Sequence, residues 1–202
     1  MTRRRSPRPG ATDAFELDEA GWLVGARHCA SPNFDARPEP ATVSLIVIHA
    51  ISLPPDRFGG PGVEELFTNR LDPTEHPYYE DICTLRVSAH FFIRRDGTVV
   101  QYVSAGERAW HAGPSCWKGR SQCNDFSIGI ELEGCDTQPF EAPQYETLAR
   151  LVGAIRARYP IEDVAGHSDI APGRKTDPGP FFDWGRLQAL LQDERLLAAR
   201  VR

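Results

Sequence analysis

Residues 166–180 (GHSDIAPGRKTDPGP) bring an imidazole, an amine and two carboxylates together on a stiff backbone. Six of these fifteen residues are Gly or Pro, so the segment predicts a rigid loop rather than a regular helix or a central strand. The loop carries His167, Asp169, Lys175 and Asp177. Imidazole and carboxylate groups that are held in place are ligands that zinc takes in proteins, so the first chemistry to consider is metal binding.

A catalytic zinc site commonly uses three protein ligands and leaves one position open for water. His167 and Asp177 could provide two ligands, and His49, near the end of an apolar run, could provide the third. These side chains would have to converge through the fold, which makes their spacing weakly specific. Each also has a structural interpretation: a His at a strand end, an Asp in the turn before Pro178, and Lys175 as a surface charge. The residues alone leave both interpretations open.

A pair of carboxylates lies in the segment FSIGIELEG, residues 126–134. Its strict alternation predicts a strand with aliphatic side chains on one face, and Glu131 and Glu133 beside each other on the opposite face. Such a pair can serve acid–base chemistry, or it can be the solvent-facing side of a strand. Both possibilities stay open at this point.

The strands that would position these groups are readable from their apolar pattern. Residues 43–51 (VSLIVIHAI) form a nearly continuous β-branched run, typical of a central strand covered on both faces. Residues 89–95 and 98–103 are predicted to be two antiparallel strands. They flank Asp96 and Gly97, a dipeptide that favours a tight type I′ hairpin turn.

Helices are predicted at residues 63–71 and 143–159, and again after Asp183, which suits an N-cap. Strands mixed with helices predict the α/β (α+β) class, with a central mixed β-sheet flanked by helices. A chain of 202 residues fits one globular domain, which we expect to span residues 16–202. Residues 1–15, rich in Arg, Pro and Ser, are expected to be a disordered N-terminal extension.

Composition excludes several classes of partner. The formal net charge of −5 gives no electrostatic basis for binding nucleic acid. No stretch approaches the roughly 20 apolar residues that cross a bilayer, so no membrane partner is expected. Five cysteines without CxxC spacing favour reduced thiols and, with no readable export signal, a cytoplasmic protein. A zinc role for Cys116 and Cys123 is less favoured than unligated thiols. We expect a monomer.

The order of the motifs resembles that of the zinc N-acetylmuramoyl-L-alanine amidases of type 2, the family whose fold is shared with peptidoglycan-recognition proteins. The resemblance extends from about Trp22 to Trp184. Within the family, the chain is similar to the cytoplasmic branch that acts on 1,6-anhydro-N-acetylmuramyl-L-alanine. The matching segments include HSDIAPGRKTDPG, IGIELEG, IHAISLPP, SPNFDARP, FGGPGVEELF, LRVSAHFFIRRDG, RAWHAG and RKTDPGPFFDW.

The resemblance implies a set of site residues. His49, His167 and Asp177 match the zinc ligands, Glu131 matches the catalytic glutamate, and Lys175 matches the catalytic lysine. It implies that Zn²⁺ activates a water molecule as the nucleophile, that Glu131 is general base and then general acid, and that Lys175 stabilises the oxyanion. The implied substrate is an anhydro-muramyl peptide in cytoplasmic cell-wall recycling.

The remaining polar residues receive weaker assignments. Arg86 and Trp110 match positions that contact the muropeptide, whereas Glu133 matches no catalytic position. His90 and His111 are interpreted as structural or substrate-adjacent. Two other functions stay open: a broad peptidoglycan amidase, such as an autolysin or lysin, and a peptidoglycan-binding module that does not cut its ligand.

Overall fold

The computed structural model describes residues 15–200, with side chains as far as Asp193. Residues 1–14 of the predicted disordered extension lie outside the described residues. The main sheet has six strands in the order β1-β5-β4-β9-β3-β10. β5 is antiparallel to β4 and the other neighbouring strands are parallel, so the predicted mixed sheet is confirmed. The strands are β1 Arg27–His28, β3 Leu45–Ile51, β4 Phe91–Ile93, β5 Val99–Gln101, β9 Ser127–Glu133 and β10 Asp163–Gly166.

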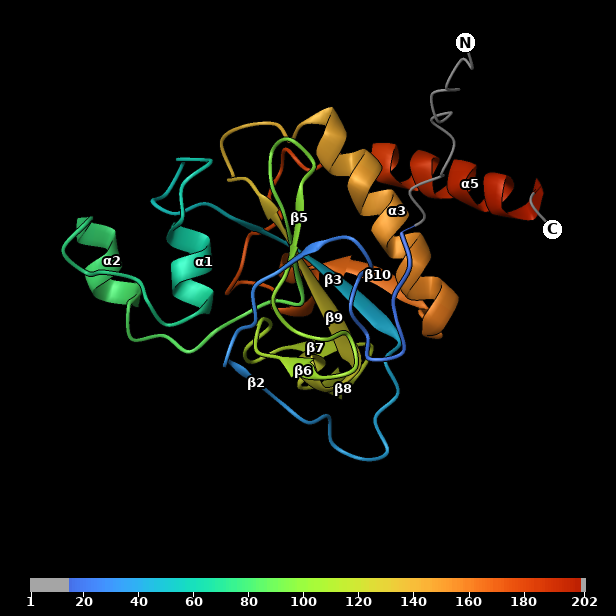
Figure 1. The fold of residues 1–202 in the computed structure, drawn as a ribbon, viewed down its shortest axis with the longest axis horizontal. Coiled ribbons are helices and arrows are strands. Elements are labelled where there is room, and N and C mark those ends of the chain that lie inside the picture. Colours follow the sequence, from blue (N-terminus) through green and yellow to red (C-terminus); the bar gives the residue numbers. More distant parts are fainter. Residues whose placement is uncertain (1–14, 201–202) are drawn as a thin grey trace, which may run out of the picture.

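One face of the sheet is covered by the long helix α3 Ala142–Arg158, with a second long helix, α5 Trp184–Arg200, beside it. They pack against each other on the same side of the molecule (Figure 1). Aliphatic residues of β3 and β9, such as Ile48 and Ile130, join Leu148 of α3 in the largest hydrophobic cluster. The predicted helix at 143–159 is confirmed within one residue at each end.

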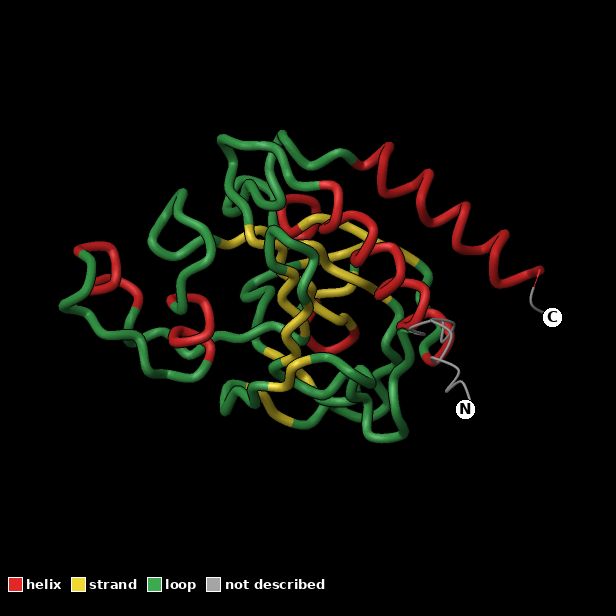
Figure 2. The backbone as a smooth tube through the Cα atoms, turned by 45° about the horizontal axis from the view of Figure 1, so that its top comes forward, coloured by secondary structure: helices red, strands yellow, loops and turns green. Residues whose placement is uncertain are grey.

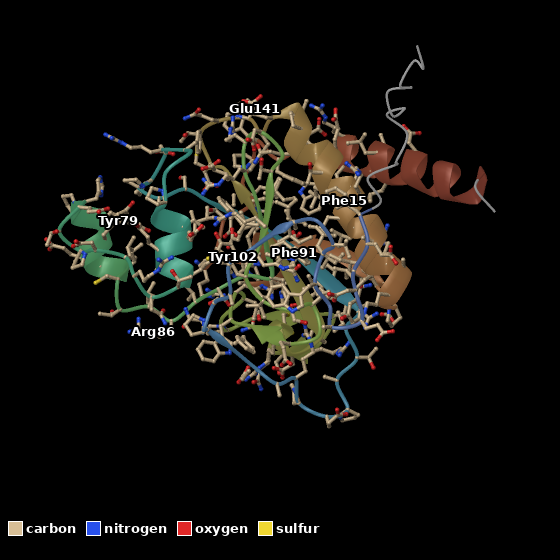
Figure 3. All side chains as sticks on the ribbon, in the orientation of Figure 1. Phe15, Tyr79, Arg86, Phe91, Tyr102 and Glu141 are labelled. Carbon is tan, nitrogen blue, oxygen red and sulfur yellow. The ribbon has the colours of Figure 1, made fainter. Side chains whose placement is uncertain are left out.

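The opposite face of the sheet carries the polar residues of β3 and β9. His49 lies directly beside Glu131 in the parallel register of these two strands, and Phe92 of β4 lies on the other side of Glu131. Phe92 belongs to a second hydrophobic cluster that includes Tyr79 and Tyr102, which are labelled in Figure 3. The alternation along β9 therefore separates a helix-covered face from a face available for chemistry.

Two short helices form the second cluster with the sheet. They are α1 Gly62–Phe67 and α2 Pro77–Ile82. Both lie at the opposite end of the molecule from α5, and long loops connect them to the sheet (Figures 1 and 2). The short helix predicted at 63–71 is confirmed, although it begins one residue earlier and ends four residues earlier than predicted.

The β4–β5 hairpin is confirmed, but its predicted turn type is wrong. Gly97 has a φ of 86°, whereas Asp96 does not have the positive φ that a type I′ turn requires. The amide N–H of Gly97 donates to Arg94 O at 2.9 Å, and the N–H of Arg94 donates to Thr98 O at 2.9 Å. The connection is therefore a three-residue loop with Gly97 in the left-handed position, a bulged turn that also fits the Asp-Gly sequence.

The loop prediction for residues 166–180 needs correction at its start. Gly166 ends β10, which pairs with β3, and a four-residue helix, α4 His167–Ile170, follows at once. The N–H of Gly166 donates to Asp169 Oδ2 at 2.7 Å, so Asp169 ties the end of the strand to the new helix. Pairing with β3 supplies hydrogen bonds that no local pattern could reveal, and Pro172 lies just beyond the helix.

Small elements complete the described chain. The predicted N-cap at Asp183 is confirmed, because the N–H of Arg186 donates to Asp183 Oδ1 at 2.9 Å. Among the described residues, no helix combines the length and the apolar character needed to cross a membrane. The other elements are β2 Phe34–Asp35, β6 Arg108–Ala109, β7 Cys116–Trp117, β8 Arg120–Ser121 and the 3₁₀ helix Cys123–Phe126.

Candidate active site

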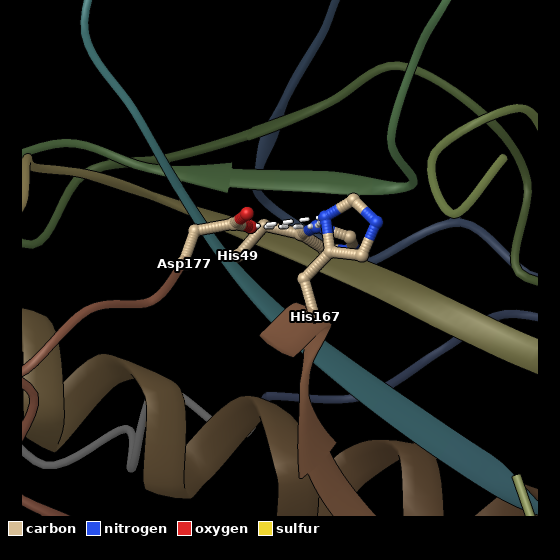
Figure 4. Close-up of side chains that lie close together, drawn as sticks. All are labelled: His49, His167 and Asp177. Atoms are coloured by element: carbon tan, nitrogen blue, oxygen red, sulfur yellow. Dashed lines mark hydrogen bonds and ion pairs between the residues drawn. The ribbon is translucent and has the colours of Figure 1, made fainter. Parts of the chain in front are cut away.

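The three predicted metal ligands meet at the carboxyl ends of β3 and β10 (Figure 4). His49 lies near the carboxyl end of β3, and His167 follows the carboxyl end of the neighbouring parallel strand β10. Asp177 is held beside them because the N–H of Ser168 donates to Asp177 O at 2.8 Å. The Nδ1 atoms of the two histidines are 2.9 Å apart, and Asp177 Oδ2 is 3.2 Å from His49 Nδ1 and 3.1 Å from His167 Nδ1.

The hydrogen bonds around this cluster favour lone pairs pointing inward. His167 Nε2 lies 3.0 Å from the carbonyl oxygen of Ala112, which can only accept, so in a neutral imidazole at this position Nε2 carries the hydrogen and Nδ1 has the lone pair. Burial lowers the pKa of His49 to about 4, which favours its neutral form. Neutral imidazole nitrogens and a carboxylate oxygen are a zinc donor set. Of the described residues, these three form the group that could hold a metal ion.

The electrostatics of Asp177 also suit a ligand. Asp177 Oδ2 lies 3.1 Å from His167 Nδ1 and 3.2 Å from His49 Nδ1, and an aspartate side chain ordinarily has a pKa of about 3.9. The carboxylate is therefore ionised near neutral pH. A negatively charged oxygen facing two imidazole nitrogens would help a cation to remain in the site.

Glu131 lies beside this cluster on β9 with few partners. Its side chain is buried, and Oε2 has no hydrogen-bond partner among the described residues. Burial raises the pKa of Glu131 well above its usual range, the charge of Asp177 adds to this effect, and the charge of Lys175 opposes it. A buried carboxyl group with a raised pKa and few partners is available to take up and release a proton, as general acid–base catalysis requires.

Lys175 and its neighbour Arg174 both line the same cavity, but Arg174 is anchored by hydrogen bonds to backbone carbonyl groups. Arg174 Nη2 donates to the carbonyl oxygens of Ala112 at 2.6 Å and Pro114 at 2.7 Å. The N–H of Lys175 donates to Ala171 O at 3.1 Å, which fixes the backbone, while the Lys175 side chain is exposed and lines the cavity. The loop thus presents one ammonium group toward the metal-ligand cluster.

The cavity has a volume of about 570 Å³. The five predicted metal and catalytic residues line it together: His49, Glu131, His167, Lys175 and Asp177. Apolar parts of its lining come from α1, α2 and the segment after them, through Leu66, Phe67, Tyr78, Ile82, Leu85 and Val87. Reactive polar groups combined with apolar side chains are the usual lining of a small-molecule site.

Two other predicted residues lie outside the cavity lining. Arg86 is exposed at the edge of the molecule (Figure 3), and its Nη1 donates to Thr84 O and Leu85 O at 3.2 Å each. The indole Nε1–H of Trp110 donates to Asp35 Oδ1 at 2.9 Å. Contact of Arg86 or Trp110 with a substrate stays a prediction.

The cysteines form no cluster with metal-ligand geometry among the described residues. Cys123 is buried and Cys116 is exposed, and all five cysteines are free thiols. The less favoured zinc site at Cys116 and Cys123 is therefore not formed in the described structure.

One contact of the site was not predicted. His111 Nδ1 lies 2.9 Å from His49 Nε2, the ring nitrogen that faces away from the metal-ligand cluster. A sequence signal for this contact exists in Gly129, because a glycine inside a β-branched strand often marks a place where another group approaches closely. Which group fills that space is decided by the fold.

A family model described as N-acetylmuramoyl-L-alanine amidase matches residues 39–180. The chain is 55% identical over 180 residues to the 1,6-anhydro-N-acetylmuramyl-L-alanine amidase AmpD of Escherichia coli strain K12. That match covers 88% of this chain and 98% of the relative.

Solved structures agree with these matches. A crystal structure of a selenomethionine derivative of AmpD superposes with a TM-score of 0.84 and 56% identity, covering 87% of this chain and 98% of that chain. The amidase AmiD from E. coli, in complex with the substrate anhydro-N-acetylmuramic acid-L-Ala-D-γ-Glu-L-Lys, superposes with a TM-score of 0.55 and 29% identity. This second match covers 87% of the chain and 65% of AmiD.

Proposed function

Because the chain belongs to the N-acetylmuramoyl-L-alanine amidase family, we propose that it hydrolyses the amide bond between 1,6-anhydro-N-acetylmuramic acid and L-alanine in muropeptides. The observation that carries this proposal is the 55% identity along 98% of the E. coli AmpD chain, whose name states that activity. The cavity supports it by bringing a metal-ligand cluster, a buried carboxyl group and an ammonium group together.

We assign the metal site to His49, His167 and Asp177. Their donor atoms are two imidazole nitrogens and a carboxylate oxygen, a set that fits Zn²⁺. Bound there, Zn²⁺ supplies a Lewis acid and makes water acidic enough to act as a nucleophile near neutral pH.

Glu131 is proposed to move the proton in this reaction. Its carboxylate takes a proton from the attacking water and then delivers it to the nitrogen of the leaving L-alanine. The buried position beside His49 supports the assignment, because the raised pKa lets the carboxyl group hold the proton between these two steps.

Lys175 is proposed to stabilise the negative charge that develops on the amide oxygen of the substrate. A fixed positive charge that acts on this oxygen lowers the energy of the transition state more than that of the bound substrate. The exposed ammonium group on the cavity rim, next to the anchored Arg174, supports this role. Arg86 and Trp110 are proposed as outer contacts to the muropeptide on the strength of their sequence motifs.

We further propose that the enzyme acts in cytoplasmic cell-wall recycling. Five free thiols support a reducing compartment, and the relatives that span the whole domain are named for the anhydro-muramyl bond. Anhydro-muropeptides released from the cell wall are then the substrate.

The test is product analysis by mass spectrometry. Purified protein is incubated with 1,6-anhydro-N-acetylmuramyl-tripeptide and, separately, with intact sacculi. Each reaction is run without chelator, with chelator, and with chelator followed by excess Zn²⁺. A His49→Ala variant is the matched control, because it removes one ligand and leaves Glu131 and Lys175 in place.

The expected result is release of free tripeptide from the small substrate, abolished by chelator, restored by Zn²⁺ and absent from the variant. Cleavage of both substrates would replace the recycling function with a broad peptidoglycan amidase. Cleavage of neither, with zinc bound, would replace it with a binding module.

A further inference from the structure

The imidazole of His111 connects a metal ligand to the backbone. Its Nδ1 lies 2.9 Å from His49 Nε2, and its Nε2 lies 3.2 Å from Ser127 Oγ. Ser127 Oγ in turn lies 2.6 Å from the carbonyl oxygen of Cys123. Four groups from three parts of the chain therefore form one continuous line of hydrogen bonds that ends at His49.

The direction of every hydrogen bond in this line follows from its last member. The carbonyl oxygen of Cys123 can only accept, so the Ser127 hydroxyl donates to it. The lone pairs of Ser127 Oγ are then available to His111 Nε2–H, which leaves His111 Nδ1 as an acceptor. That acceptor takes the hydrogen of His49 Nε2, and His49 Nδ1 is left unprotonated toward His167 and Asp177.

Gly129 makes room for this arrangement. A Cβ atom at position 129 would lie 2.5 Å from Cγ and 2.6 Å from Nδ1 of His111. Real Cβ atoms do not approach other atoms so closely, so His111 can occupy this place only because residue 129 has no side chain. The glycine lies two residues before Glu131 on the face of β9 that carries the site.

From this geometry we propose that His111 is a positioning residue for the metal site. It holds His49 in the tautomer with hydrogen on Nε2, so that Nδ1 presents its lone pair to the metal ion before the ion arrives. The inference rests on the proposed function, because it takes His49, His167 and Asp177 as metal ligands. Partners of this kind commonly contribute about 10- to 100-fold to metal affinity.

The first test reads the tautomer in zinc-free wild-type protein. Long-range ¹H–¹⁵N correlation spectra of histidine-labelled protein show which ring nitrogen of His49 is protonated, with assignments taken from single histidine variants. We expect the hydrogen on Nε2 of His49. A hydrogen predominantly on Nδ1 of His49 would overturn the proposal. This measurement is made on the wild-type protein, without a substitution in the line of hydrogen bonds.

The second test measures zinc affinity by competition with a chromophoric chelator. His111→Leu removes the acceptor and should weaken zinc binding about 10- to 100-fold. His111→Asn keeps an acceptor oxygen near the position of Nδ1 and should recover most of the affinity. Gly129→Ala should resemble His111→Leu, because the added methyl group displaces the ring.

The matched control is His90→Asn. His90 is also buried, but its Nδ1 accepts from the N–H of Gly129 at 3.0 Å and its Nε2 donates to Glu107 O at 3.0 Å. It touches no metal ligand through a hydrogen bond, so zinc affinity should stay within about twofold of wild type. Folding of every variant is checked by circular dichroism before titration.

Equal zinc affinity in folded His111→Leu and wild-type protein would overturn the proposal. Weak binding by His111→Leu that is not restored in His111→Asn would also overturn it, because filling of space rather than hydrogen bonding would then explain the loss. If the wild type binds zinc with the expected tautomer but leaves the anhydro-muropeptide intact, the proposed function fails and the role of His111 stands.

Discussion

Glu131 and Glu133 lie two residues apart on the same face of β9, yet their surroundings are opposite. Glu133 accepts hydrogen bonds from the N–H groups of Gly59 at 2.5 Å and Arg95 at 3.1 Å, and it pairs with Arg94 Nη1 at 3.5 Å. Glu131 Oε2 is buried without a hydrogen-bond partner among the described residues. The comparison teaches that partners, rather than residue type or burial, separate a structural carboxylate from one that is available for a reaction.

The same difference separates the two cations of the loop before Asp177. Arg174 donates to Ala112 O and Pro114 O and thereby holds two segments together. Arg174 and Lys175 both line the cavity, but the exposed side chain of Lys175 is not tied to these carbonyl groups. In each pair, one charged group is held by hydrogen bonds to the fold, whereas the other lines the cavity without such an anchor among the described residues.

The largest expected effect comes from Glu131→Gln. Turnover of anhydro-muramyl tripeptide should fall by about 10² to 10⁴, because the amide cannot carry the proton from water to the leaving nitrogen. Zinc content and the free energy of unfolding should not fall, since Glu131 Oε2 gives up no hydrogen bond among the described residues. Single-turnover kinetics, metal analysis and urea unfolding measure the three quantities.

Glu133→Gln in the same assays is the comparison. If Glu131→Gln retained wild-type turnover while Glu133→Gln lost it, the roles assigned to the two carboxylates would be reversed.

Lys175→Ala should give the next largest effect, a decrease of about 10² to 10³ in kcat with a smaller change in KM. The reason is that the ammonium group acts on charge that develops in the transition state. The melting temperature should stay unchanged, because the side chain is exposed. Steady-state kinetics and thermal unfolding check both expectations, and a decrease in kcat below about threefold would contradict the role.

Arg174→Ala should show the reverse pattern. It removes the anchors to Ala112 and Pro114 and should lower the melting temperature while retaining a larger share of kcat than Lys175→Ala. A similar loss of kcat in both variants would remove the distinction between the two cations.

Glu133→Gln should mainly cost stability. A glutamine offers one acceptor oxygen where two N–H groups now bind, and its NH₂ group would face the second donor. We expect the free energy of unfolding to fall by about 1 to 3 kcal/mol, with turnover reduced only a few-fold through the Gly59 loop. Urea unfolding of the zinc-loaded protein measures the loss, and an unchanged midpoint would mean that these contacts do not hold the loop.

Local patterns in the sequence predicted much of this architecture. The β-branched run ending near His49 and the alternation through Glu131 became neighbouring central strands, because both patterns are direct consequences of burial on one or two faces. The helix over residues 143–159 followed from its apolar stripe. The convergence of His167 and Asp177 with His49 could be anticipated through the family resemblance rather than from their spacing.

Features that depend on contacts distant in sequence could not be predicted. Strand β10 owes its existence to pairing with β3, and its Gly-containing end resembles a loop when considered alone. The contact between His111 and His49 requires that the loop with His111, the glycine of β9 and the end of β3 come together. Such arrangements follow from packing, for which the local sequence carries only a partial sign, here Gly129.

The smallest expected effect concerns the histidines near Gly129 and is a pH dependence of stability. His90 is bonded through both ring nitrogens to the backbone, whereas His111 is bonded to side chains of the site. Burial, with the Arg37 guanidinium close by, lowers the pKa of His90 to about 3. The His90 imidazole therefore takes up a proton near pH 6.5 in the unfolded chain, but only near pH 3 in the folded protein.

The sign of this effect follows directly. The contribution of His90 to the free energy of unfolding is fully present above pH 6.5 and is lost as pH falls toward 3. The slope from this one group is up to about 1.4 kcal/mol per pH unit. His90→Asn should flatten the curve over this window by that slope, even if it lowers stability at pH 7, while the pH profile of turnover keeps its shape. Urea unfolding between pH 7 and pH 5 measures the difference. If the slope for His90→Asn equalled that of the wild type, the pKa of His90 would be the same in the folded and the unfolded protein. The assignment of His90 to a structural role and of His111 to the site would then rest on geometry alone.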